Sequence, residues 1–570
     1  MGSVSLNGST FMKRITLTAI SFMVLLSLFS NTVNASNTTF KDVPRDHWAH
    51  DEIRFLSSKG VIKGFASGEF KPLVILTRKD AAIMLVRAMR LKAPSNPKIV
   101  PSDMKPTMGG YKEVLTVMEK GMFTLNGKSF MPDKPLTRKE MAKAIAVAYN
   151  YKGAGKSSFK DLPKSNPYYT FIDAIAENDV TSGYKDGTFK PEVPVSRAQF
   201  SVFLARIYSE PLEYAVKENG KVLHKVRKAD QAIDLALKYP KATVHPVSNS
   251  LMNYDNQTGM MTDSGIGNGV LIYNGNENPM KFTPEFFEPY ISIKPNDGSR
   301  RPLFDTFIIL GRSYPNGEFG QISSNHANFS EWRWYAERTF AADGTLENLN
   351  SAAKQQGKKA NVYIAIPYPK QKEAIIDLDG KKRANNLNER SNLITWYMND
   401  VQSKWQKAGY SNLTFKGYYW LNETVGSLED ELLVEKTAKS IHSQNKKFIY
   451  SPHALSNNFE NWKIYGFDGV YLQPNTFRLK LTDTQKRLHL AFLRAQVNGI
   501  GINIEIDTYS PHQMASGVQN FAQYVEMAER YGLPGRSLIF YQGNEMVYRM
   551  GTYNLSPYQE GYQLMDRVFK

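Results

Sequence analysis

Two glutamates lie at the carboxyl ends of segments that are typical of buried β-strands. Glu423 ends FKGYYWLNE, residues 415–423, and Glu505 lies near the end of GIGINIEID, residues 499–507. Two facing carboxyl groups can cleave a glycosidic bond, because one protonates the leaving oxygen while the other attacks the anomeric carbon or activates water. This chemistry requires that both strand ends face one site, so the surrounding elements decide whether the pair can act.

Apolar segments of strand length alternate with helical patterns over residues 248–570. The predicted strands are 269–275, 304–311, 361–369, 415–423, 447–453, 467–475, 499–507 and 537–543, and the predicted helices are 331–339, 388–408, 428–443, 483–497 and 514–531. Strands joined by helix-length connections indicate βα units in a parallel sheet. Eight such units predict a (β/α)8 TIM barrel. A doubly wound sheet is the alternative, but no G-x-G-x-x-G loop follows the first strand.

The seventh predicted strand has one apolar and one polar face. Its isoleucines at 500, 502, 504 and 506 share one parity, and the other parity carries Gly501, Asn503, Glu505 and Asp507. A barrel strand that delivers residues to the top of the barrel has this pattern. In a closed barrel, the ends of strands four and seven face each other across the mouth, which brings Glu423 and Glu505 to one site.

The Asn422-Glu423 dipeptide and the glutamate on strand seven resemble the large clan of retaining (β/α)8 glycosidases. The resemblance implies that Glu423 is the acid/base, that Asn422 holds the sugar 2-hydroxyl, and that Glu505 is the nucleophile. Asp507 is the main rival nucleophile. The further residues that we expect to bind substrate near the strand ends are Trp420, Asn503, Asp507, His453, Gln473 and Tyr541. For Trp420, packing in the core is the alternative.

A repeat of about 60 residues fills the first third of the chain. FKDVP at 40–44 returns as FKDLP at 159–163, and GFASGEFKP at 64–72 returns as GYKDGTFKP at 183–191. LTRKD, LTRKE and VSRAQ follow in register, with Thr77, Thr137 and Ser196 as predicted N-caps of helices. The middle copy lacks a clear FKDVP-like start and has FTLN at 123–126 in place of the Gly-aromatic turn.

These three copies resemble S-layer homology (SLH) repeats, with boundaries at 36–95, 96–155 and 156–210. The resemblance implies an α-helical three-prong module that binds pyruvylated secondary cell-wall polysaccharide on Gram-positive surfaces. It implies that the grooves between the prongs are lined by Asp42, Trp48, Arg78, Arg138, Asp161 and Arg197. An arginine fork suits the carboxylate of a pyruvyl ketal, because two parallel charge-assisted bonds fix its orientation. The alternative is that each arginine is an ordinary residue of a first helical turn.

The remaining segments are an export signal and a linker. Residues 1–35 have a positive region at Lys13 and Arg14, an apolar stretch at 15–29 and a small-residue cleavage site at 33–35, with 1–11 as an upstream extension. This pattern predicts a signal peptide, and a membrane anchor is the alternative, although the apolar stretch is short for a span. Residues 211–247 are predicted to form a linker with one helix at 228–239.

The composition of the chain limits the classes of molecule that it is expected to bind. The chain has no cysteine, a formal charge of +17 and a pI of 9.4. For an exported basic protein, an anionic cell-wall polymer is a better partner than nucleic acid, since no basic run with interleaved aromatic residues indicates base stacking. No histidine or acidic residues at ligand spacing accompany His453, so neither a metal nor a cofactor is expected. We therefore expect a multi-domain protein of a Gram-positive cell wall or S-layer, with no membrane contact after signal removal.

Two functions fit this organisation. In the first, the repeats anchor a barrel that hydrolyses a surface or wall polysaccharide, including peptidoglycan as a possible substrate. In the second, the barrel is a degenerate, non-catalytic glycan-binding or S-layer structural domain. The barrel also resembles an uncharacterised family found downstream of SLH repeats and grouped with barrel glycosidases, which supports the fold more than the activity.

Overall fold

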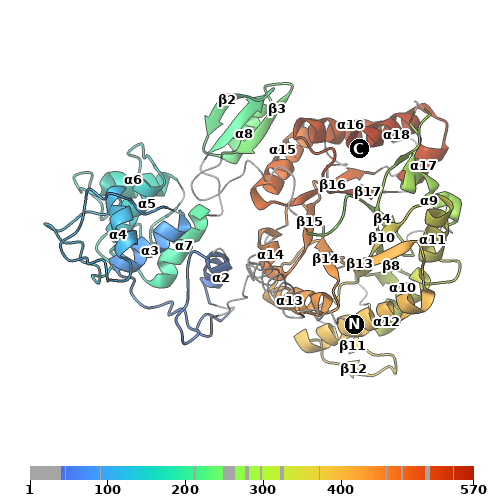
Figure 1. Cartoon of the computed structure of the whole chain (residues 1–570), viewed down its shortest axis with the longest axis horizontal. Helices are drawn as coiled ribbons and strands as arrows, with labels where there is room; N and C mark the ends of the chain where they lie inside the picture. Colours follow the sequence, from blue (N-terminus) through green and yellow to red (C-terminus); the bar gives the residue numbers. More distant parts are fainter. Residues whose placement is uncertain are drawn as a thin grey trace, which may run out of the picture.

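The chain folds into a repeat module, a small α/β unit and a barrel, as the computed structural model in Figure 1 shows. The structure describes residues 40–569 except 45–46, 59, 90, 179, 209–212, 248–262, 277–281, 296–297, 321–326, 372, 457–458, 477–478, 480, 508–513 and 544. The predicted signal peptide lies outside the described residues. Within the described ranges, no helix has the length and apolar character needed to cross a membrane.

Six helices build the repeat module, two from each copy. They are α2 (His50–Ser58), α3 (Arg78–Ala88), α4 (Tyr111–Glu119), α5 (Arg138–Ala148), α6 (Tyr169–Glu177) and α7 (Arg197–Tyr208). The predicted caps are present: the Thr77 hydroxyl accepts the Asp80 N–H at 3.1 Å, and Thr137 and Glu140 form a capping box. One apolar core runs through all three copies, so the repeats fold as one unit.

The three copies close into a ring. Three backbone hydrogen bonds of 2.8 Å lie at its centre. The Leu76 N–H donates to the Val195 carbonyl, the Leu136 N–H donates to the Leu76 carbonyl, and the Val195 N–H donates to the Leu136 carbonyl. Each copy therefore contacts both others through the segment just before its second helix. The middle copy takes its full place in this ring, although its sequence is the most divergent.

Residues 213–247 form more than the linker helix that we expected. The unit contains β1 (Tyr214–Glu218), β2 (Lys221–Val226), α8 (Ala229–Ala236) and β3 (Ala242–Pro246), in an antiparallel sheet of order β2-β1-β3. The helix was predicted, but the three strands were missed. Asn219 and Gly220 both have positive φ, as a tight hairpin turn requires. The unit has a small core of its own, which includes Val216 and Val244.

The barrel is closed by eight parallel strands, as predicted. They are β4 (Asn268–Tyr273), β7 (Thr306–Leu310), β10 (Ala360–Ile366), β13 (Leu413–Trp420), β14 (Lys447–Tyr450), β15 (Gly469–Leu472), β16 (Gly501–Ile506) and β17 (Leu538–Gln542). Around the closed sheet they follow the order β10-β13-β14-β15-β16-β17-β4-β7. β13 and β16 are therefore strands four and seven, which carry the two glutamates.

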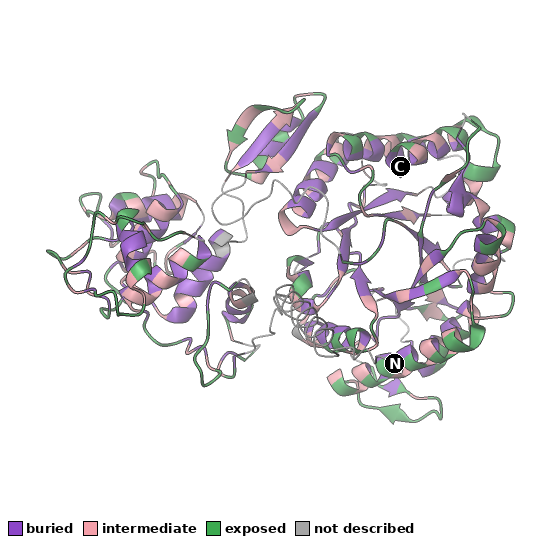
Figure 2. Cartoon of the chain, in the orientation of Figure 1, coloured by how far each residue is buried: buried purple, intermediate pink, exposed green. Residues whose placement is uncertain are grey.

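Helices surround the barrel and cover its outer face (Figure 2). They are α9 (Pro284–Ile291), α10 (Phe329–Thr339), α11 (Thr345–Gln355), α12 (Leu387–Ala408), α13 (Leu428–Ser443), α14 (Trp462–Tyr465), α15 (Leu481–Asn498), α16 (Met514–Arg530), α17 (Met546–Thr552) and α18 (Ser556–Val568). Apolar residues of one strand parity pack under these helices. The opposite parity fills the barrel interior with a second, separate cluster that includes Leu271, Tyr363, Tyr419, Tyr471 and Ile539.

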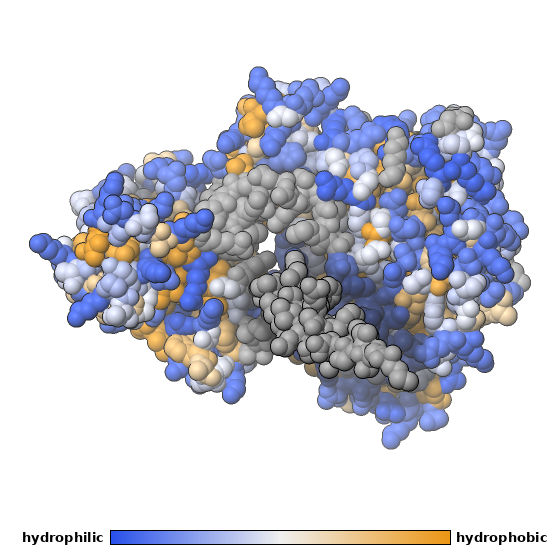
Figure 3. Space-filling view, viewed as in Figure 1, coloured by the Kyte–Doolittle hydropathy of each residue, from blue (hydrophilic) through white to orange (hydrophobic). Residues whose placement is uncertain are grey.

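The three parts contact one another. Arg54 on α2 of the first repeat forms a buried ion pair with Glu435 on α13 of the barrel. The small unit packs on α15 through Leu493, and the Val244 N–H donates to the Tyr531 hydroxyl at 2.9 Å. On the face shown in Figure 3, hydrophobic surface gathers over the repeat module, whereas the barrel surface is mostly hydrophilic.

Candidate functional site

Glu423 follows β13 at the mouth of the barrel. It shares the interior parity of Tyr419 and Leu421, both of which belong to the interior cluster. Its backbone is held by three donors to its carbonyl oxygen: the Tyr450 hydroxyl at 2.8 Å, the Ser456 hydroxyl at 3.1 Å and the His453 N–H at 3.3 Å. The strand after β13 therefore fixes where the Glu423 side chain begins.

Glu423 is exposed to solvent. Partial desolvation nevertheless raises its pKa, and the nearby charge of Arg312 opposes the rise. Arg312 lies two residues beyond the end of β7 and also acts electrostatically on Tyr273 and Tyr541. The mouth thus combines the carboxyl group of Glu423, the guanidinium of Arg312 and tyrosines from several strands.

Glu505 lies deeper, on the interior face of β16, and only 1% of its surface is exposed. Its Oε2 accepts a hydrogen bond from the Tyr524 hydroxyl on α16 and another from the Asn475 N–H at 2.6 Å. Its Oε1 is buried without a hydrogen-bond partner among the described residues. Burial raises the pKa of Glu505 to about 8, and the charge of Glu423 adds to the rise, whereas the two hydrogen bonds oppose it.

The structure brings several other predicted residues to the strand ends. The Tyr541 hydroxyl donates to Asp507 Oδ2 at 3.3 Å, and Asp507 is half-buried. Asn503 is fully buried below Glu505, and its amide donates to the Ser451 hydroxyl at 3.0 Å. His453 and Gln473 form a β-bridge between the loops after β14 and β15.

Asn422 and Trp420 lie on the other parity of their strand. Asn422 is buried, and its amide donates to the Thr424 carbonyl at 2.8 Å. Trp420 is 1% exposed and packs edge-on against Tyr368 and Phe448 in the layer between strands and helices. The ring of Trp420 is thus enclosed in the core on the face opposite Glu423, as the alternative of core packing describes.

Two residues that sequence reasoning missed belong to this site. Arg312 could have been found, because it is a charged residue directly after a predicted barrel strand. Tyr524 carries no such signal, since its position on α16 gives no hint that its hydroxyl reaches Glu505. Within the described part of the chain, no group of three or more His, Asp or Glu side chains is placed to hold a metal ion.

In the repeat module, three aspartates occupy equivalent positions. Asp42 accepts the N–H groups of Phe70 and Lys71 at 2.7 and 2.6 Å, and Asp161 accepts those of Phe189 and Lys190 at 2.8 and 2.7 Å. Asp103 does the same in the middle copy at 2.8 and 2.7 Å. Asp103 was not predicted, because its flanking residues do not repeat the FKDVP pattern. Each carboxylate shapes the loop against which an arginine docks.

The three predicted arginines are buried between copies, and each packs against a loop of the next repeat around the ring. Arg78 donates through Nε to the Phe130 carbonyl at 2.8 Å, Arg138 to Phe189 at 2.7 Å and Arg197 to Phe70 at 2.8 Å. Each guanidinium also lies over the ring of that phenylalanine, at 4.8, 4.5 and 4.5 Å from its centre. The arginines therefore join the copies to one another.

Arg138 differs from Arg78 in its acidic partner. Arg78 forms an ion pair with Glu140 of the next repeat and donates to the Thr124 carbonyl at 2.8 Å. The residue equivalent to Glu140 in the third repeat is Gln199, and no carboxylate of the described residues forms an ion pair with Arg138. A cavity of about 210 Å³ lies beside Arg138 and is lined by residues of all three copies, including Trp48, Tyr184 and Gln199. We call it the Arg138 groove.

Models of two known families match two separate parts of the chain, the barrel and the repeat module. The model of the family described as "Domain of unknown function (DUF4855)" matches residues 268–568, the barrel. The model of the S-layer homology domain matches residues 39–82 and 158–201, in the first and third repeats.

Curated relatives match over about the length of the repeat module. The "S-layer protein sap" of Bacillus anthracis is 31% identical over 184 residues, 30% of this chain and 22% of the relative. The "Surface-layer 125 kDa protein" of Lysinibacillus sphaericus is 29% identical over 165 residues, 28% of this chain and 14% of the relative. The "Endoglucanase" of Bacillus sp. (strain KSM-635) is 29% identical over 198 residues, 32% of this chain and 20% of the relative. The chain thus covers about a fifth or less of each relative.

Proposed function

Because this chain belongs to the DUF4855 family and carries S-layer homology domains, we propose that it is an anchored glycoside hydrolase of the bacterial surface. The SLH domains and the S-layer relatives make it a cell-surface protein of the S-layer or cell wall. The proposal adds that the repeats bind pyruvylated secondary cell-wall polysaccharide and that the barrel cleaves a neighbouring polysaccharide.

The catalytic part of the proposal rests on two glutamates at the carboxyl ends of strands four and seven of one closed barrel, Glu423 after β13 and Glu505 on the interior face of β16. In the retaining mechanism, Glu423 donates its proton to the glycosidic oxygen while a Glu505 oxygen forms an ester with the anomeric carbon. Water then attacks that carbon, its proton passes to Glu423, and Glu505 leaves as the carboxylate. With the pKa of Glu505 at about 8, the pair keeps one proton at neutral pH, and the mechanism requires that this proton lie on Glu423 when Glu505 attacks.

The surroundings of Arg138 support the proposal that the repeats bind wall polysaccharide. Its guanidinium has a single hydrogen bond to the described residues, through Nε, and faces a cavity that no carboxylate neutralises by an ion pair. A pyruvyl ketal carries one carboxylate, which a guanidinium binds through two parallel N–H groups. Trp48, with 59% of its surface exposed, can cover the sugar from the side of the first repeat.

Hydrolysis is tested with the full chain, its Glu423→Gln variant and a Glu460→Gln control. Glu460 is a surface carboxylate paired with Arg494 and takes no part in the proposed site. Each protein is incubated with purified cell-wall polysaccharide and with peptidoglycan, and new reducing ends are counted. The proposal expects release by the wild type and the control and a loss of at least about 100-fold in Glu423→Gln.

The burial of Glu505 favours a second candidate, a non-catalytic glycan-binding barrel. A nucleophile must reach the anomeric carbon, whereas Glu505 is 1% exposed and its Oε2 is occupied by Tyr524 and Asn475. In that case Glu505 only holds the loop after β15. The absence of new reducing ends with all three proteins, together with glycan binding that survives Arg138→Ala and is therefore not due to the repeats, would favour this candidate instead.

A further inference from the structure

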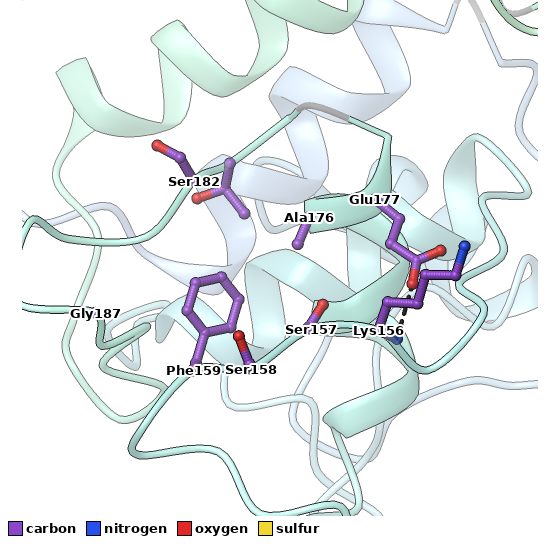
Figure 4. Close-up of a pocket in the computed structure, with 9 residues that line it drawn as sticks. Lys156, Ser157, Ser158, Phe159, Ala176, Glu177, Ser182 and Gly187 are labelled. Atoms are coloured by element: carbon purple, nitrogen blue, oxygen red, sulfur yellow. Dashed lines mark hydrogen bonds between the residues drawn. The ribbon is translucent and has the colours of Figure 1, made fainter.

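A second cavity, of about 380 Å³, lies on the third repeat next to the Arg138 groove. Its walls include Ser157, Ser158, Phe159, Glu177 and Ser182. We call it the serine pocket. Figure 4 shows Ser182 opposite Phe159, with Ala176 and Glu177 at the end of α6 and the segment from Lys156 to Phe159 closing the other side. Thr181 and Ser182 line both cavities, so the serine pocket and the Arg138 groove are adjacent.

The lining of the serine pocket suits an uncharged sugar. Serine hydroxyls both donate and accept hydrogen bonds, and the half-buried ring of Phe159 offers an apolar face. Glu177 is fixed by the N–H groups of Ala154 and Lys156 at 2.8 and 2.9 Å, which leaves each oxygen able to accept a further hydrogen bond. The charges of Lys156 and Glu177 balance, whereas Arg138 has no ion pair with any of the residues that the structure describes.

The other copies do not repeat this lining. The middle repeat has Phe123 and Thr124 where the third has Thr181 and Ser182, and Phe123 is buried against Phe130 with ring centres 5.5 Å apart. The middle repeat also has Ile99 and Val100 where the third has Ser157 and Ser158. The first repeat has Ile62 and Lys63 at the positions of Thr181 and Ser182. The serine pocket is therefore a property of the third repeat and not of the repeat pattern.

We propose that the Arg138 groove and the serine pocket are two adjoining subsites for one polysaccharide chain. The groove takes the carboxylate-bearing sugar, and the serine pocket takes the neighbouring, uncharged sugar. This inference rests on the proposed anchoring function and adds that recognition extends beyond the charged residue. It predicts that binding strength depends on the length of the glycan.

The test measures binding of two synthetic probes to the full chain by calorimetry. One probe is a hexose with a pyruvyl ketal, and the other is a disaccharide in which an uncharged hexose is added to it. We expect the disaccharide to bind about tenfold more tightly than the monosaccharide, which corresponds to about 1.4 kcal/mol. Ser158→Leu should remove that advantage and leave the affinity for the monosaccharide unchanged.

The matched control is Val100→Leu, which places the same side chain at the equivalent exposed position of the middle repeat and should change neither affinity. Arg138→Ala should abolish binding of both probes. Equal affinities of the wild type for the two probes, or a disaccharide advantage that survives Ser158→Leu, would overturn the second subsite and leave the Arg138 groove standing. Failure of the wild type to bind either probe would overturn the proposed anchoring function as well.

Discussion

A single replacement of an acid by its amide distinguishes the surroundings of Arg138 from those of Arg78. In the repeat module, Arg78 pairs with Glu140 of the next repeat. The residue of the third repeat that is equivalent to Glu140 is the uncharged Gln199. Gln199 keeps the capping role of the acid, because its Oε1 accepts the Ser196 N–H at 3.0 Å. The replacement therefore changes the groove without changing the helix.

This comparison predicts the effect of restoring the acid. Gln199→Glu should weaken binding of pyruvylated wall polysaccharide by at least about tenfold, because the new carboxylate would pair with Arg138 as Glu140 pairs with Arg78. Sedimentation of the protein with purified cell walls measures the effect. The reciprocal change, Glu140→Gln, should not weaken binding. Undiminished binding by Gln199→Glu would show that Arg138 is not the anion site.

The pKa of Glu505 sets the expected pH dependence of hydrolysis. As nucleophile, Glu505 must be ionised, and its pKa of about 8 in the unliganded protein means that most molecules carry a proton there at pH 6. The mechanism also needs the proton of Glu423, so the active form holds one proton on the pair, and kcat/KM, which reports ionisations of the free enzyme, should fall as the pH rises through about 8 and that proton is lost. A kcat/KM that keeps rising above pH 8 would contradict this mechanism.

At the scale of the elements, the eight barrel strands depend on close approaches between neighbours. Gly417 on β13 lies opposite Lys447 on β14, and a Cβ at Gly417 would lie 1.8 Å from the Lys447 carbonyl oxygen. The two strands carry Glu423 and the residues that hold its backbone. Their spacing therefore controls both the stability of the barrel and the position of the candidate acid.

Gly417→Ala should accordingly destabilise the barrel by about 3 kcal/mol or more, because the strands must separate to admit the methyl group. Denaturant unfolding followed by tryptophan fluorescence measures this loss. Gly426→Ala serves as control, since the nearest atom to its Cβ would be the Thr424 hydroxyl at 3.9 Å. Equal stability of the two variants would mean that β13 and β14 have more freedom than their register suggests.

The sequence was sufficient to predict the elements whose patterns are local. The alternation of Ile500, Ile502 and Ile504 with polar residues predicts β16, and the end of α12 at Ala408 was correctly placed before Gly409, which has positive φ. The hairpin of the small unit could have been found too, because Asn219-Gly220 is a strong turn signal. The same alternation of faces along a strand places Trp420 and Glu423 on opposite sides of β13, which argues against substrate contact by both.

Contacts between distant segments could not be predicted in this way. Tyr524 reaches Glu505 only because α16 packs beside β16, and Arg54 meets Glu435 only because the module docks on the barrel. Neither residue has a pattern in its own neighbourhood that distinguishes it from an ordinary helix residue. The pKa of Glu505 depends on the same packing, so it could not be predicted from the sequence either.

At the scale of the whole molecule, one buried ion pair ties the anchor to the barrel. Arg54 and Glu435 have side chains that are 10% and 8% exposed, and the position of Arg54 is occupied by Leu115 in the middle repeat. Arg227 of the small unit adds a contact to the third repeat by donating to Asn178 at 2.7 Å. These contacts join the repeat module to the rest of the protein.

Arg54→Leu should loosen this arrangement. Removing the cation beside buried Glu435 should cost about 3 kcal/mol and split thermal unfolding into two transitions, one for the module and one for the barrel. Calorimetry and small-angle scattering measure the two effects. The double variant Arg54→Leu/Glu435→Leu should recover most of the lost stability. A single, unshifted transition in Arg54→Leu would show that the ion pair does not couple the two parts.

The ring of three repeats has a consequence for how such a protein can evolve. Recombination lengthens and shortens open repeat arrays one copy at a time, because every internal copy meets its neighbours through the same two faces. Here the third arginine returns to the first loop, so two copies would leave a face bare and a fourth would have no place to dock. The number of copies is therefore fixed at three, and new binding properties must arise by substitutions within these three repeats.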